Sequence, residues 1–521
     1  MRPLLNTALL GLLTLVSAHA ETVSQVSQYG VTWTFDRPRE TGRFVTGDHW
    51  VVGPVTIVSV SPASGPSADT SPATEATKSR YGAAALVDDR RMRNGSMIVA
   101  GPAPRGPKNS TGFDQQGYDS RAINYEPALS QSFPLLVNPG TSLISTVSNE
   151  ERDASGKLAT PSILGQFRFF LTKPLESLAL RSAAVLTVLD KAPPADAFRP
   201  AYAGKDKTIY RAGTLRRDLL PKLPPVASTP DWAMMERIFE RPWLDHTASW
   251  TNQHLLPGEN QPSYGREFAR LTSIAALMVM LDVPPERREK LLLSYIQLGI
   301  DLSAVARMGR HWFPDGGHWQ GRKWPILFAS MMLDAPALRD FPKTDPAVPV
   351  YGYFKVNPSP DGTKPATLFQ EDVTTYYGRG GDGQNVLWQI GSHTGPKQPY
   401  EEKSRASFEK GDNFLDAYRP NNACSWIGTA LAASHMKAIA LWNHDAYFDY
   451  MDRWMSPDEK WDQPKWLPKG ATRSFDLFTE EMWRAHRASA PDQPRGRDNL
   501  KWVWDATNRS GSLVPNPTVT P

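Results

Sequence analysis

Cysteine is almost absent from this chain: Cys424 is the only one in 521 residues. A single cysteine cannot form an internal disulfide, so a small disulfide-stabilised fold is excluded. A chain of this length can instead bury one or two sizeable hydrophobic cores. Cys424 stands in a tight apolar helical segment, which predicts a small buried core residue rather than a catalytic thiol.

Net charge is also low, with 58 Lys and Arg against 54 Asp and Glu. This excess is too weak to indicate nucleic-acid binding, and no basic run or RNA-binding signature is present. The sequence has no His-Glu-x-x-His, no cysteine pair and no EF-hand loop, so no metal site is predicted. It also lacks a glycine-rich phosphate loop and a Gly-x-Ser-x-Gly elbow.

Long apolar runs are confined to the N-terminus. Arg2 precedes the apolar stretch Leu4 to Val16, and Ala18-His19-Ala20 matches a small-x-small cleavage pattern. The pattern predicts a signal peptide over residues 1–20 and export to the periplasm or beyond the cell. No later run has the length of a membrane span.

Tryptophan, in contrast, is abundant, with 17 residues. Several of them stand beside Pro, Gly or Asp, in segments that we expect to be loops. Flat aromatic faces stack well on sugar rings. The composition therefore favours a carbohydrate as the binding partner.

The distribution of apolar residues predicts an α+β multidomain protein. Alternating runs separated by turn residues indicate a β-sandwich-like domain over residues 21–195. A proline-punctuated linker is expected over 196–230. Predicted strands include 31–35, 50–60, 96–100, 142–148 and 183–189.

Beyond residue 231 the apolar period becomes helical. Stripes at 268–281, 291–305 and 427–441 each mark one helix face. Further helices are expected around 231–240, 324–339, 445–455 and 474–487. We therefore predict a helical catalytic domain over 231–490 and a C-terminal tail over 491–521. The long segments 340–370 and 378–420 are expected to be functional loops.

The richest candidate site is the stretch from His311 to Lys323, which contains three glycines and a proline. Trp312 and Trp319 are predicted to stack on a sugar ring. Arg322 or Lys323 would bind a carboxylate on that sugar. His318 and Arg322 are four residues apart, so they would share a face if the helix has already begun.

A second candidate group precedes and begins the first long helix. It contains Trp250, Asn252 and His254, followed by Tyr264 and Arg266. Asn, His, Tyr and Arg side chains can together bind a carboxylate and transfer a proton. We therefore include all five in the predicted site.

A third group lies in the segment from Phe369 to Tyr377. Glu371 and Asp372 precede Tyr376 and Tyr377, and a plain structural strand would seldom carry two adjacent carboxylates. Asn422, in a later polar pair, completes the predicted substrate-binding residues.

This combination of an exported, Trp-rich chain with a β domain and long-looped helix pairs resembles the α/α-toroid polysaccharide lyases, such as alginate and glucuronan lyases. The resemblance rests on the helical part, on Asn252, His254 and Tyr264, on His318-x-x-x-Arg322, and on Tyr376-Tyr377. The order of domains, with β first, differs from many relatives. The resemblance implies an incomplete α/α barrel and a uronate polymer as substrate, with no cofactor.

The resemblance also implies roles for individual residues. His318 would remove the C5 proton of the uronate, and Tyr377 or Tyr264 would protonate the leaving oxygen. Asn252, His254 and Arg322 would neutralise the carboxylate and stabilise the carbanion-like state.

Two other functions fit the same sequence. An inverting glycoside hydrolase on an α/α barrel would use Asp315 with Glu371 or Asp372, placed roughly 6.5–9.5 Å apart. A non-catalytic carbohydrate-binding protein would need only an exposed aromatic strip. The Arg and Lys content of the 311–323 stretch favours an anionic substrate and hence the lyase.

Overall fold

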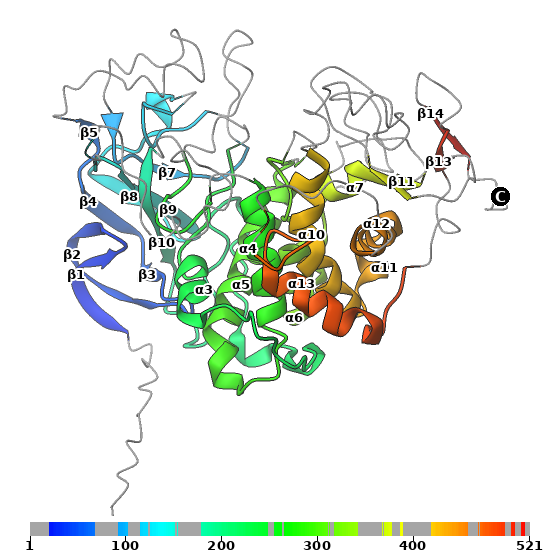
Figure 1. Ribbon diagram of the computed structural model, residues 1–521. Coiled ribbons are helices and arrows are strands. Elements are labelled where there is room, and N and C mark those ends of the chain that lie inside the picture. The colour runs from blue at the N-terminus through cyan, green and yellow to red at the C-terminus, as the bar shows by residue number, and fades with distance from the viewer. Residues whose placement is uncertain are drawn as a thin grey trace, which may run out of the picture.

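The computed structural model describes residues 20–67, 92–102, 115–122, 125–151, 154, 179–247, 255–262, 265–310, 312, 317–341, 367, 369–377, 386–388, 418–456, 467, 469–494, 502–505 and 512–515. These residues form an N-terminal sheet followed by a helical region, so the predicted mixed α+β class is confirmed (Figure 1). All but the last residue of the predicted signal peptide lies outside the described residues.

The main sheet has eight strands in the order β7-β9-β10-β3-β2-β4-β8, and β1 pairs with β2 beside this path. Its pairs are antiparallel except for β10 with β3, which is parallel. The strand bounds are β1 Glu21–Gln28, β2 Val31–Arg43, β3 His49–Val52, β4 Val55–Ser61, β7 Ser96–Ile98, β8 Leu135–Val137, β9 Thr141–Ser148 and β10 Leu180–Leu189. A separate short pair is formed by β5 Gly65–Pro66 and β6 Met92–Arg93.

The sheet curls into a half-barrel, where the sequence predicts a sandwich of two sheets. Strand β10 explains the difference, because both of its faces are buried. Ala184, Leu186 and Val188 join the core inside the curl. Ala183 and Val185 join the large core shared with the helices. A strand covered on both sides has a continuous apolar run instead of an alternating one.

Two helices follow the predicted stripes 268–281 and 291–305, whereas the predicted stripe 427–441 is divided between two helices by a turn in which Lys437 has a φ of 55°. The helix bounds are α3 Trp232–Phe239, α4 Gly265–Met278, α5 Pro285–Arg307, α6 Lys323–Met332, α7 Gln370–Thr374, α10 Tyr418–His435, α11 Ile439–Trp442, α12 Asp445–Met455 and α13 Leu477–His486. Helix α10 packs on α4 and α13, and α5 packs on α6 and α3. Cys424 is buried in this core, as predicted. Among the described residues, no helix combines the length and apolar character that a membrane span requires.

Two short strand pairs complete the described structure. Strand β11 Thr375–Tyr377 pairs with β12 Val386–Trp388 beside α12. Strand β13 Trp502–Asp505 pairs with β14 Ser512–Pro515 in the predicted C-terminal tail. Most of the predicted long loops, 340–370 and 378–420, lie outside the described residues.

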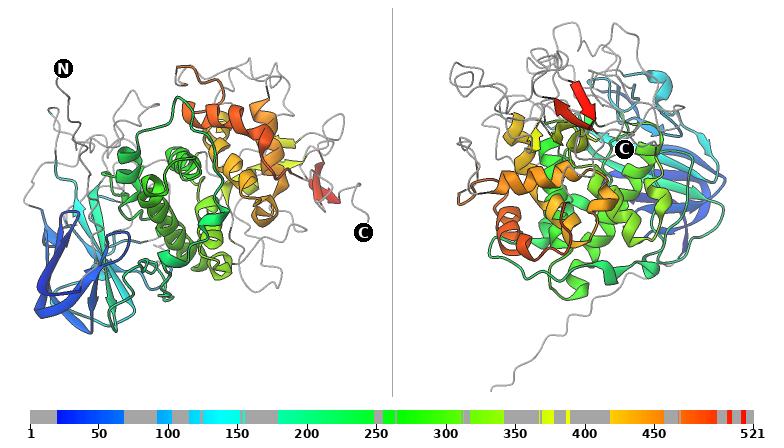
Figure 2. Two further views of the ribbon diagram at one scale, coloured as in Figure 1. Left: turned by 90° about the horizontal axis from the view of Figure 1, so that it is seen from below. Right: turned by 90° about the vertical axis from the view of Figure 1, so that its right-hand side faces the viewer.

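The first part of the segment predicted as a linker packs between sheet and helices, and its later part runs along the helices as far as α13, where Ser228 Oγ donates to Glu481 (Figure 1, Figure 2). Arg199 is fully buried and joins the two parts. Its Nε donates to Asp48 Oδ2 at 2.7 Å, and its Nη2 donates to Asp301 Oδ2 at 2.5 Å. Asp48 precedes β3 and Asp301 belongs to α5. A buried Arg between two carboxylates fixes the sheet against the helices, because leaving one of these charges unpaired is costly.

Candidate functional site

Two segments far apart in the sequence meet at the start of α6. The main-chain N–H of Trp319 donates to Gln370 Oε1 at 2.9 Å, and that of Gly321 donates to Glu371 Oε1 at 2.6 Å. Lys323 Nζ forms an ion pair with Asp372. Three successive residues of helix α7 therefore bind the turn before α6. The predicted first and third polar groups lie together.

The beginning of α10 is the third member of this arrangement. Asn422 Oδ1 accepts from Gln370 Nε2 at 2.6 Å, and the Asn421 carbonyl accepts from Gln320 Nε2 at 3.0 Å. Arg266, in the first turn of α4, donates from Nη1 to Asn421 Oδ1 at 2.8 Å. Four chain segments thus contribute side chains to one cluster. We call this cluster, with the turn 317–323, the candidate site.

Glycines allow these segments to approach so closely. Gly321 has a φ of 90°, and a Cβ at this position would lie 2.5 Å from Ala269 Cα. At Gly265, a Cβ would lie 2.0 Å from the carbonyl oxygen of His318. The left-handed φ and both contacts require glycine. The backbone of α4 therefore lies directly against the turn that carries His318.

Arg322 does not continue a helix from His318. Helix α6 begins at Lys323 and His318 lies in a turn, so the condition for a shared helix face is not met. The three glycines of the stretch favour a bent backbone over a helix. Arg322 Nη1 contacts the main-chain oxygen of His318 at 3.4 Å. The His318 side chain is half-buried, and its ring lies at an angle to that of Trp319.

A buried ion pair fixes the Arg322 guanidinium. Its Nε and Nη2 donate to the two carboxylate oxygens of Asp245 at 3.1 and 3.2 Å. The guanidinium carbon also lies 3.6 Å from the centre of the Phe268 ring. Both charged side chains are almost completely enclosed. Arg322 thus has its carboxylate partner within the protein.

The two predicted tryptophans differ in their surroundings. Trp312 is 0% exposed, stacks on Phe369 and donates its indole N–H to Asp245 Oδ2 at 2.8 Å. Trp319 is 8% exposed, and the Arg310 guanidinium carbon lies 5.0 Å from its ring centre. Trp312 is therefore placed as a packing residue, and Trp319 lies closer to the surface.

The carboxylates of α7 have contrasting environments. Glu371 is 1% exposed, and burial raises its pKa to about 7, although its hydrogen bond from Gly321 opposes the shift. Its Oε2 has no hydrogen-bond partner among the described residues. Asp372, by contrast, accepts from Trp442 Nε1 at 2.8 Å in addition to its ion pair with Lys323. A buried acid beside a charged pair is an arrangement found at catalytic sites.

His444 lies next to the carboxyl end of helix α7. Its Nε2 lies 2.8 Å from the Thr375 carbonyl oxygen, at the start of β11. Burial lowers the pKa of the imidazole, which favours the neutral ring. Tyr376 and Tyr377 follow in the same strand and pair with Leu387 and Val386, but the described structure does not extend to their side chains.

Eight of the predicted site residues belong to the candidate site as described: Arg266, Trp312, His318, Trp319, Arg322, Lys323, Glu371 and Asn422. The other predicted positions, together with Asp315 of the alternative, lie outside the described residues or have undescribed side chains: Trp250, Asn252, His254, Tyr264, Tyr376 and Tyr377. Their roles stay predictions.

Sequence analysis missed Asp245, which binds both Arg322 and Trp312. This residue lies in an irregular segment with neither helical nor strand periodicity, so no local pattern marks it. The proximity of Trp250 was the only available signal. Gln370, which joins the turn to α10, was also missed, because an amide beside two carboxylates carries no distinctive motif.

The sheet contacts this region through Tyr118. Its hydroxyl lies 3.2 Å from His246 Nε2, and His246 follows Asp245 in the chain. Burial lowers the pKa of His246 to about 4, so the ring is neutral at pH 7. The main-chain N–H of Asp245 donates to the Tyr202 hydroxyl at 3.0 Å. Two buried tyrosines thus support the segment that holds Arg322.

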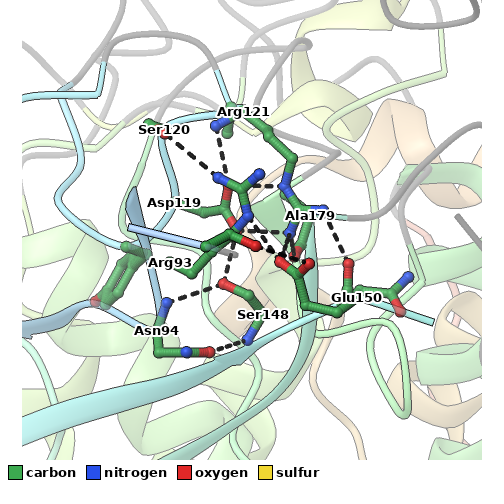
Figure 3. Close-up of polar contacts among 12 residues, drawn as sticks. Arg93, Asn94, Asp119, Ser120, Arg121, Ser148, Glu150 and Ala179 are labelled. Atoms are coloured by element: carbon green, nitrogen blue, oxygen red, sulfur yellow. Dashed lines mark hydrogen bonds and ion pairs between the residues drawn. The ribbon is translucent and has the colours of Figure 1, made fainter. Parts of the chain in front are cut away.

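A second polar cluster holds the segment that carries Tyr118 (Figure 3). Asp119 is fully buried and accepts from Ser148 Oγ at 2.7 Å and from Arg121 Nη2 at 2.7 Å. Arg93 donates from Nε to Glu150 Oε1 at 2.8 Å. The cluster ties β6 and β9 to the Tyr118 segment. Its charges are paired with one another, which indicates a structural role.

Among the described residues, no group of three or more His, Cys, Asp or Glu side chains is arranged to hold a metal ion. The candidate site is thus a cluster of paired charges, one buried acid and partly enclosed aromatic rings. Comparison of the chain with protein-family models, with curated proteins and with solved structures gave no match.

Proposed function

We propose that the chain is an exported polysaccharide lyase that cleaves a uronate-containing polymer by β-elimination. The observation that carries the proposal is the meeting of the turn 317–323 with α7 and the start of α10. Three predicted groups, separated by about fifty residues each along the chain, become neighbours there. Polar residues gathered from distant segments are characteristic of catalytic sites.

The charges around this cluster favour an anionic substrate. Arg266 and Lys323 lie in it, paired with Glu267 and Asp372, and the Arg310 guanidinium lies over the Trp319 ring beside it. Glu371 is close to half-protonated at neutral pH, since its pKa is about 7. It therefore contributes less than a full negative charge. A sugar carboxylate would bind at Arg310 with the Trp319 ring beside it, or would replace Glu267 or Asp372 as the partner of Arg266 or Lys323.

Within the proposal, the residues divide into two kinds. Arg322 and Trp312 hold the site in shape through Asp245. Arg266, with Asn252 and His254, is the proposed carboxylate-binding set. Lys323 and Asn422 position α7 and Gln370.

The proposed reaction moves one proton in each direction. His318 takes the C5 proton, and the electron pair left on C5 forms the C4=C5 double bond. The C4–O4 bond breaks with its electrons on O4, and Tyr377 or Tyr264 donates a proton to that oxygen. Gly265, at the start of α4, packs on the main chain of His318, and Tyr264 itself lies outside the described residues.

The proposal extends to architecture and location. The contacts of α4 with α10, α10 with α13 and α5 with α6 are compatible with an incomplete α/α toroid. The predicted signal peptide over residues 1–20 would direct the chain to the periplasm or the exterior.

Inverting hydrolysis is a second candidate, because of Glu371. A buried carboxylic acid with a pKa of about 7 is suited to protonate a glycosidic oxygen. In this alternative Asp315 would be the general base. A non-catalytic carbohydrate-binding protein would use the same surface without turnover.

Incubation of the mature protein with a panel of uronate polysaccharides tests the proposal. Ultraviolet absorbance and reducing ends are followed together. Both rise in β-elimination, because the product is a conjugated unsaturated uronate. A rise in reducing ends alone would instead support hydrolysis. Binding without either signal would support the non-catalytic protein.

A further inference from the structure

A cavity of about 470 Å³ lies away from the candidate site, at the junction of sheet and helices. Its walls come from the β1–β2 hairpin, the β2–β3 connection, the end of α3 and helix α5. It shares no lining residue with the candidate site. Its size is in the range of small-molecule sites. Its lining includes Gln28, Tyr29, Arg43, Glu240, Lys290 and Ser294.

One wall contains a buried acceptor without a partner. Gln28 is 7% exposed, and its Nε2 donates to the Gly47 carbonyl at 3.0 Å. Its Oε1 has no hydrogen-bond partner among the described residues. A buried acceptor left unpaired costs about 1–3 kcal/mol. Because Oε1 is itself enclosed, a ligand hydroxyl would reach it and remove this cost after the Gln28 side chain rotates toward the cavity.

The rim of the cavity is positively charged. Arg43 and Lys290 each carry a positive charge. Glu240 carries one negative charge, and its carboxylate lies 2.9 Å from Lys290 Nζ. Among the described residues, the Arg43 guanidinium makes one hydrogen bond, from Nη1 to the Gly47 carbonyl at 2.8 Å. The net charge of these three side chains is therefore favourable for a carboxylate.

The hairpin wall is a tight two-residue turn. Tyr29 (φ 50°) and Gly30 (φ 86°) lie between the paired residues Gln28 and Val31, and a type I′ hairpin turn requires left-handed values at both central residues. Its hydroxyl donates to the Glu240 carbonyl at 2.9 Å, at the end of α3, and the Arg241 guanidinium lies 4.6 Å from its ring centre. The turn and these two contacts fix Tyr29 in the cavity wall.

We propose that this cavity binds a sugar acid, meaning a small polyhydroxy carboxylate such as a single uronate residue. The carboxylate would lie between Arg43 and Lys290, and a ring hydroxyl would donate to Gln28 Oε1. Ser294, one turn beyond Lys290 on α5, supplies a further hydroxyl. Identifying the ligand as a uronate rests on the proposed function, whereas the need for a hydroxyl donor and an anion rests on the cavity alone.

Calorimetric titration of the full mature protein with glucuronate tests the inference, with glucose as the neutral comparator. Lys290→Met should weaken glucuronate binding about tenfold or more, the effect expected for a lost charge-assisted hydrogen bond. The Lys290 side chain is 56% exposed, so the fold should tolerate the change. Lys222→Met, an exposed lysine outside the cavity, is the matched control.

Gln28→Met is the second variant, because it removes the acceptor at a similar side-chain length; it also removes the Nε2 hydrogen bond to the Gly47 carbonyl. It should also weaken glucuronate binding, with its folding checked by thermal melting. Unchanged affinity in both variants, or equal affinity for glucose, would overturn the inference.

The outcome is separable from that of the proposed function. Both cavity variants are also assayed on the uronate polymers, where turnover should persist. Glucuronate binding that depends on Lys290, in a protein without any turnover, would support the cavity and count against the lyase. Turnover of the polymers without glucuronate binding would support the lyase and count against the cavity. A third titration, with a short uronate oligosaccharide, distinguishes a site for a free monomer from one for a chain end.

Discussion

The main-chain N–H of Gly321 donates to Glu371 Oε1 at 2.6 Å, so one short hydrogen bond joins the turn before α6 to helix α7. Gly321 can make this bond because it has a left-handed φ of 90° and packs its Cα side on Ala269. The alignment of the candidate site therefore depends on a residue without a side chain.

Gly321→Ala should destabilise the protein by about 3 kcal/mol or more. Left-handed backbone costs about 1–2 kcal/mol for an L-residue, and overpacking adds about 1–3 kcal/mol. Gly309→Ala is the matched control, since Gly309 has a φ of 88° and open space around its Cβ position. Denaturant unfolding of both variants measures the difference. Equal losses would show that the contact with Ala269 is unimportant.

Glu371 should make stability fall as pH rises. Its folded pKa of about 7 lies above the ordinary value of 4.5, so the unfolded chain loses its proton first. The free energy of unfolding begins to fall near pH 4.5, and the fall reaches about 3 kcal/mol and is complete above pH 7. Glu371→Gln should remove this dependence and be more stable than the wild type at pH 8, while exposed Glu286→Gln should not. Parallel pH profiles for wild type and Glu371→Gln would contradict the assignment.

The Arg322–Asp245 pair gives a test of whether Arg322 is structural. Arg322→Met should cost about 3–5 kcal/mol, because it leaves Asp245 charged and buried. Adding Asp245→Asn removes the unpaired buried charge and keeps an acceptor for the Trp312 indole. The double variant should therefore recover much of the lost stability. Arg216→Met, at an exposed pair, should cost about 1 kcal/mol or less. A double variant that is stable but has a strongly raised KM would instead place Arg322 on the substrate.

Local periodicity explains what could be predicted from the sequence. The stripes at 268–281 and 291–305 correspond to α4 and α5, and the run 183–189 lies in β10. Each of these patterns depends on neighbours within a few residues. Titratable and aromatic residues also concentrate in 311–323 and 369–377, which makes these segments candidates, and their role in a site stays a prediction.

Non-local pairing explains what could not be predicted. Asp245 and Arg322 form their ion pair although they are 77 residues apart in the sequence, and no local pattern predicts such a partner. The segment around Arg199 was expected to be a linker because of its prolines, yet two distant carboxylates bury it. The curled sheet was expected to be a sandwich, because alternation reveals buried faces but not which element covers them.

The proposed base and acid can be tested directly. His318→Ala and Tyr377→Phe should each lower kcat by about 10²–10⁴-fold, the usual contribution of general acid–base catalysis. His435→Ala is the matched control, because His435 is half-buried and its ring nitrogen lies 3.1 Å from the His486 carbonyl oxygen. It should leave kcat unchanged.

The measurement is the initial rate of ultraviolet absorbance on the best polymer of the panel, with thermal melting as the check on folding. Full activity in both His318→Ala and Tyr377→Phe would remove these residues from the mechanism. Loss of reducing-end formation in Glu371→Gln, with His318→Ala unaffected, would assign the chemistry to the buried acid and hence to hydrolysis. Elimination needs a base at C5, so it should lose more activity in His318→Ala than in Glu371→Gln. Hydrolysis needs an acid at the glycosidic oxygen, so it should lose more activity in Glu371→Gln than in His318→Ala.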